Sequence, residues 1–75
     1  MARRRRFSVD TRNRYTRRTM APMIVDWLTD HGWDRDTAKM EVQTWEDYGL
    51  SELTETPKRD VRRAIRELLA HGRFR

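Results

Sequence analysis

The chain has 75 residues, of which 17 are Lys or Arg, 12 are Asp or Glu and none is Cys, and its net charge is +5. A chain this short makes one small domain with a single core, so we expect no elaborate active site. The lack of cysteine excludes a disulfide scaffold and a thiolate zinc site, and no apolar run approaches the roughly 20 residues of a membrane span. These features predict a soluble intracellular protein, cytoplasmic or nucleoid-associated.

The charge is divided into three blocks along the chain. Residues 1–20 carry a net charge of +7, residues 21–54 carry −6, and residues 55–75 carry +4. Two basic ends around an acidic middle create a strong local field, so an anion is the natural partner of those ends.

Residues 1–18 are rich in Arg and small polar residues, and their few apolar residues cannot form a core, so we expect a flexible basic arm. Its basic run, Arg3, Arg4, Arg5 and Arg6, is a candidate for contact with a DNA groove or with structured RNA. A solvated tail and an organellar targeting segment are the alternatives. The "RFSV" stretch also has the alternation of a short strand.

Residues 19–75 are expected to form a helical domain. The first helix is predicted to begin at Thr19–Pro22 and to end at Gly32, with one apolar face made by Met20, Met23, Ile24, Trp27 and Leu28. The second is predicted to begin near Asp34 or Asp36 and to run to Gly49, burying Ala38, Val42, Trp45 and Tyr48. At this spacing Trp27 and Trp45 are interpreted as core residues and not as base-stacking platforms.

No enzyme chemistry is indicated by the ionisable residues. His31 and His71 each precede a glycine that ends a helix, where a histidine faces the last carbonyls, and neither has a metal-binding spacing. Glu41, Glu46 and Asp47 of the second helix form no recognisable carboxylate pair and have no glycine-rich phosphate loop beside them. We expect no catalytic residue, no metal and no cofactor.

The segment "LSELTET" is predicted to contain one short helical turn capped by Ser51, with Leu50 and Leu53 pointing inward. A third helix is predicted to follow, with Thr56 as its cap, Pro57 at its start and Gly72 just after its end. Its apolar stripe has helical spacing and consists of Val61, Ala64, Ile65, Leu68 and Leu69.

The third helix also segregates its charges. A rotation of about 100° per residue gathers five cations in one sector of about 140° beside the apolar stripe. These nucleic-acid-binding candidates are Lys58, Arg59, Arg62, Arg63 and Arg66. Asp60 and Glu67 fall on the remaining face, and Arg63 is the expected partner of Glu67. The alternative is a solvated basic face that binds no partner.

The segment "LSELTETPKRDVRRAIRELLAHGRF" resembles the helix-turn-helix of winged-helix transcription regulators. The matching positions are the apolar pair before the turn, the polar turn, the β-branched residue early in the second helix, the late apolar pair and the glycine before a wing. Two departures are the lack of a glycine in the turn and room for only one wing strand after Gly72, so the other would come from "RRRFSV". A three-helix fold without a wing is equally compatible with the pattern.

The sequence therefore predicts a small all-α, helix-turn-helix-like domain that binds nucleic acid, with DNA favoured over RNA. Helix 57–71 and the Arg-rich arm would contact phosphates and a groove. The alternative is an RNA-binding protein or a protein adaptor, for example in a viral or mobile-element assembly, with a protein partner at the acidic helix 34–48. No membrane partner is expected. The pattern does not define the oligomeric state, and a dimer is one alternative.

Overall fold

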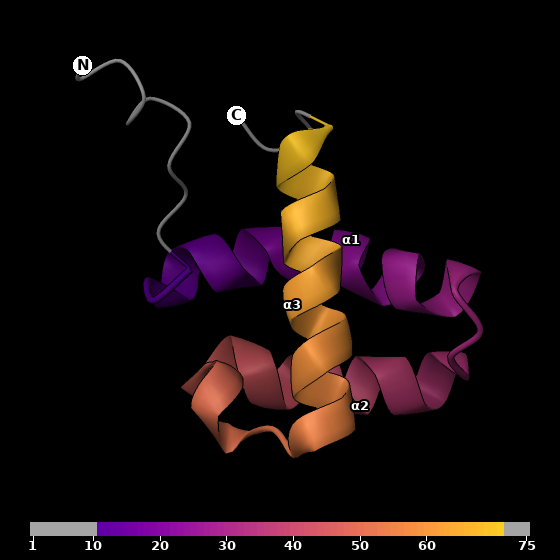
Figure 1. Ribbon diagram of the computed structural model, residues 1–75. Coiled ribbons are helices and arrows are strands. Elements are labelled where there is room, and N and C mark those ends of the chain that lie inside the picture. The colour runs from indigo at the N-terminus through magenta and orange to yellow at the C-terminus, as the bar shows by residue number, and fades with distance from the viewer. Residues whose placement is uncertain (1–10, 72–75) are drawn as a thin grey trace.

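The computed structural model describes residues 11–71 and has three α-helices and one 3-10 turn in this range. They are α1 (Arg14–Asp30), α2 (Arg35–Tyr48), η2 (Leu50–Glu52) and α3 (Glu55–Ala70). Helices α1 and α2 lie side by side and antiparallel, and α3 crosses both of them on one face (Figure 1). The expected small all-α, three-helix domain is confirmed, and residues 11–71 contain no strand.

Helix α1 begins earlier than the sequence suggested. Asn13 caps it, because its side-chain oxygen accepts hydrogen bonds from the backbone N–H groups of Tyr15 (2.8 Å) and Thr16 (3.3 Å). The predicted start near Thr19 is therefore wrong, and residues 14–18, which were assigned to the arm, are helical. Pro22 lies inside the helix and not at its first turn.

A buried arginine fixes this early start of α1. The Arg17 side chain is only 7% exposed; its Nε donates to the Glu46 carbonyl at 2.9 Å, and its Nη1 donates to the Thr11 carbonyl at 3.0 Å. Glu46 belongs to the last turn of α2, whose carbonyls have no partner within the helix. Arg17 thus satisfies an end of α2 and holds the chain before α1, so this part of the basic N-terminal block is structural.

Helix α2 begins in the predicted region near Asp34 or Asp36 and ends at Gly49 as predicted, with Asp34 as its cap. Asp34 accepts a hydrogen bond from the Thr37 backbone N–H at 3.1 Å, and Gly49 follows the helix with a φ of 95°. That value lies in the region that only glycine adopts readily, as does the φ of 98° at Gly32 after α1. Tyr48 was expected in the core, but it is 69% exposed, because it is the last residue of α2 and points away from the packed face.

The segment between α2 and α3 forms the expected short turn, but its caps differ from those predicted. Leu53 is buried and Leu50 packs against the core, whereas η2 has no side-chain cap, so the role assigned to Ser51 is wrong. Helix α3 begins at Glu55 after Thr54, and Thr56 is its second residue and not its cap. Pro57 remains within the first turn, where a missing N–H costs no helical hydrogen bond.

The core lies where the three helices meet. Trp45, Met20, Ile24, Leu28, Val42 and Val61 are its largest fully buried side chains. Trp45 is thus confirmed as a core residue, while Trp27 is half-buried at the edge of the core. The apolar stripe of α3 is confirmed too: Val61, Ala64, Ile65 and Leu68 are buried, and Leu69 packs beside them. The suggested pairing of "RRRFSV" with the C-terminal residues lies outside the described range.

Candidate nucleic-acid interface

The outer face of α3 carries the basic residues that the sequence singled out. The apolar stripe of α3 is buried against the core, and α1 and α2 both lie on one side of α3, so they leave its other side uncovered (Figure 1). Arg59, Arg62, Arg63 and Arg66 are exposed, and Lys58 is half-buried. We call these five residues the α3 basic face. The candidates Arg3, Arg4, Arg5 and Arg6 lie outside the described residues.

Three members of the α3 basic face have no ion-pair partner among residues 11–71. Lys58, Arg62 and Arg66 form no ion pair or side-chain hydrogen bond within residues 11–71. Arg62 and Arg66 are one helical turn apart, where like charges repel each other mildly. Their positive potential is therefore not cancelled locally, and an anion bound between them would relieve the repulsion.

Arg63 is held at the side of the α3 basic face by an aromatic stack. Its guanidinium carbon lies 5.7 Å from the centroid of the Trp27 ring, within the range of a cation–π contact. The Trp27 ring is stacked on His31, with 3.6 Å between the ring centroids, and His31 Nδ1 lies 2.7 Å from the Trp27 carbonyl oxygen. The histidine therefore faces the carbonyls at the end of α1, as expected.

The expected ion pair between Arg63 and Glu67 is not formed. A Glu67 carboxylate oxygen lies 4.0 Å from His71 Nε2, and Arg63 is directed to Trp27 instead. The reason is tertiary, because α1 places an aromatic ring beside Arg63 that the α3 sequence alone does not reveal.

Arg59 is oriented by a contact that sequence analysis missed. Its Nε donates to one carboxylate oxygen of Asp60 at 3.2 Å, and the other carboxylate oxygen accepts from Trp33 Nε1 at 2.9 Å. Trp33 lies in the connection between α1 and α2, so a side chain distant in sequence fixes the carboxylate. No spacing pattern joins residues 33 and 60, so the sequence alone does not reveal this contact.

The N-terminal end of α3 is less positive than its middle. Glu55 is the first residue of the helix and lies one turn before Arg59, while Glu52 is exposed in η2. Carboxylates at this end stabilise the helix, because they interact with the positive end of its dipole. They also reduce attraction for phosphates at this end, so the strongest anion attraction lies around Arg62 and Arg66.

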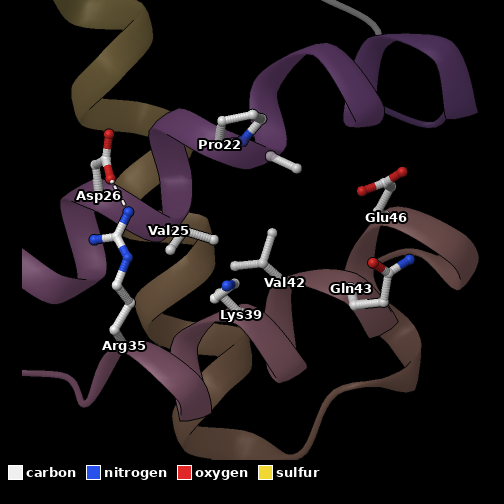
Figure 2. A pocket seen from close by; sticks show the side chains of 9 residues that line it. Pro22, Val25, Asp26, Arg35, Lys39, Val42, Gln43 and Glu46 are labelled. Atoms are coloured by element: carbon white, nitrogen blue, oxygen red, sulfur yellow. Dashed lines mark hydrogen bonds and ion pairs between the residues drawn. The ribbon is translucent and has the colours of Figure 1, made fainter.

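The face of the molecule opposite α3 carries a groove with charges of both signs. A groove of about 350 Å³ lies between α1 and α2, and α3 passes behind it (Figure 2). Ala21, Val25 and Val42 contribute its apolar part, and Arg35 Nη2 reaches across to Asp26 at 2.9 Å. Charges of both signs line this groove, so it is not a second basic surface.

The acidic residues of α2 are partly used within the domain. Asp34 caps the helix, and Asp47 accepts hydrogen bonds from Gln43 Nε2 (3.1 Å) and Arg14 Nη2 (3.0 Å). The hydrogen bond from Gln43, supported by Arg14, holds the pKa of Asp47 below its ordinary value of 3.8. The Arg14–Asp47 contact joins the end of α2 to the start of α1, and these contacts leave fewer free carboxylates for a partner.

Neither a metal site nor a membrane span is recognisable among the described residues. In the range 11–71, no three His, Cys, Asp or Glu side chains are grouped closely enough to hold a metal ion. None of the helices in this range has the length and apolar content of a membrane-spanning segment.

Comparison with protein-family models, with curated proteins and with solved structures gave no match. The resemblance to winged-helix regulators therefore remains a prediction.

Proposed function

We propose that this protein binds duplex DNA through the α3 basic face, mainly by contacts with phosphates. The observation that carries the proposal is the segregation of five cations on one outward face of α3, three of them without an ion pair in residues 11–71. A solvated face needs charge, but it does not need five cations gathered in one sector of the helix.

The shape of α3 suits the proposal. An α-helix with its side chains is about 10–12 Å wide, and the major groove of B-DNA is about 12 Å wide. Helix α3 has 16 residues and crosses the α1–α2 pair on one face, so it is the most protruding element on that side (Figure 1). Duplex RNA is a weaker candidate, because its major groove is too narrow for a helix.

The composition of α3 favours phosphate contact over extensive base readout. The helix contains no Asn or Gln, the side chains that read adenine with two hydrogen bonds. Arg and Lys on an exposed face bind phosphates irrespective of sequence, and each such contact releases counterions from the DNA.

The test is a fluorescence-anisotropy titration of labelled duplex DNA at several salt concentrations. Four to five phosphate contacts predict that log K falls with log salt with a slope of about −3.5 to −4.5. A duplex RNA and a single strand of the same length serve as competitors, and the protein should bind duplex DNA more tightly than either of them. Absence of binding to any nucleic acid at low salt would contradict the proposal and favour a protein adaptor.

A further inference from the structure

Arg59 differs from the other cations of the α3 basic face, because a carboxylate fixes the direction of its guanidinium. The Arg59 side chain is 72% exposed, while that of Asp60 is 18% exposed. Asp60 has both carboxylate oxygens occupied, one by Arg59 Nε at 3.2 Å and the other by Trp33 Nε1 at 2.9 Å. The chain Trp33–Asp60–Arg59 therefore presents an oriented arginine at an exposed surface position.

This arrangement suits a base edge better than a phosphate. Because Nε is engaged, the two terminal nitrogens remain as a pair of parallel donors. A guanine presents two acceptors, O6 and N7, at matching positions in the major groove, and a paired arginine contact with them is the commonest specific contact to DNA. Asp60 also offsets part of the positive charge, which weakens attraction for phosphate but does not affect the directional match with guanine.

The position of Arg59 on α3 agrees with this role. Arg59 is in the second turn of a helix that begins at Glu55. In helix-turn-helix domains the N-terminal residues of the recognition helix contact base edges. Arg62 and Arg66 lie further along the helix, without a carboxylate to orient them.

We propose that Arg59, positioned by Asp60 and Trp33, reads a guanine in the major groove and gives the protein a sequence preference. This inference rests on the proposed function, since α3 must dock on duplex DNA. Asp60 and Trp33 act as positioning residues and make no base contact themselves.

The experiment selects bound duplexes from a randomised DNA pool and then measures affinities for the enriched and an unrelated duplex. We expect the full chain to enrich a guanine at one position. Arg59→Lys keeps the charge but not the paired donors, so discrimination should fall by about 5- to 150-fold while affinity for the unrelated duplex changes by less than about 2-fold. Trp33→Phe, which leaves Arg59 intact, should lower discrimination by about 2- to 10-fold.

Arg62→Lys is the matched control, since it makes the same change on the same face without a positioning carboxylate. It should leave discrimination unchanged. If Trp33→Phe lowers the melting temperature of the protein, Asp60→Asn is used in its place, because asparagine keeps the shape of the side chain.

The inference is overturned if the full chain binds DNA without enriching any base, or if Arg59→Lys retains full discrimination. It is also overturned if Arg62→Lys loses as much discrimination as Arg59→Lys. In each of these results DNA is still bound, so the proposed function survives. Failure to retain any duplex at low salt would contradict both the proposed function and this inference.

Discussion

At the scale of single residues, Arg17 shows how a basic side chain can belong to the fold and not to a binding surface. It is buried, it has no carboxylate within ion-pair distance among residues 11–71, and its donors meet the carbonyls of Glu46 and Thr11. A buried cation is tolerated when its hydrogen bonds are made and when the negative end of a helix dipole lies beside it. The end of α2 supplies both conditions.

Replacement of Arg17 by Met tests this role. The change removes two hydrogen bonds to a charged donor and leaves the Glu46 carbonyl without its partner, so we expect the free energy of unfolding to fall by about 2–4 kcal/mol. Arg18→Met is the control, because Arg18 is exposed, and it should change stability by no more than about 0.5 kcal/mol. Urea unfolding followed by circular dichroism measures both, and equal losses would contradict the structural role of Arg17.

At the scale of elements, local pattern predicted the middles of the helices and missed the start of α1. The apolar stripe of α3 and the start of α2 near Asp34 or Asp36 are local features, and both are confirmed, with Asp34 as the cap. The sequence pattern predicted a start at Thr19–Pro22, but Asn13 caps the helix nine positions before Pro22. The contact of Arg17 with α2 supports the extra turns, and no local rule reveals such a contact.

Pro22 should therefore reduce the stability of α1. A proline inside a helix leaves the carbonyl four residues earlier, here that of Arg18, without its usual donor. We expect Pro22→Ala to restore this hydrogen bond and to raise the free energy of unfolding by about 1–3 kcal/mol, because alanine is the better helix former. A urea titration measures the change, and a decrease in stability would show that the proline ring makes packing contacts worth more than the lost hydrogen bond.

At the scale of the whole molecule, the fold converts charge blocks of the sequence into distinct faces. The α3 basic face lies on one side, and the groove with charges of both signs lies on the other (Figure 2). The five basic candidates on α3 could be predicted from helical periodicity, because they share one element. The positioning of Arg59 and Arg63 could not, since Trp33 holds the Asp60 partner of Arg59 and Trp27 lies beside Arg63, both from other parts of the chain.

The central claim is that the α3 basic face, and not net charge, binds DNA. The most direct measurement compares the salt dependence of duplex binding for the full chain, for the double variant Arg62→Gln with Arg66→Gln, and for Arg35→Gln. Arg35 lies on the groove face, paired with Asp26, so its removal changes net charge away from α3. Glutamine keeps helix propensity, so the fold should be retained.

If Arg62 and Arg66 bind phosphates, the double variant should lose affinity on every duplex, and its log–log salt slope should shrink by about 2 units. Arg35→Gln should leave the slope unchanged. Equal weakening by Arg35→Gln and by the double variant, or an unchanged slope in the double variant, would contradict the assignment of α3 as the docking surface.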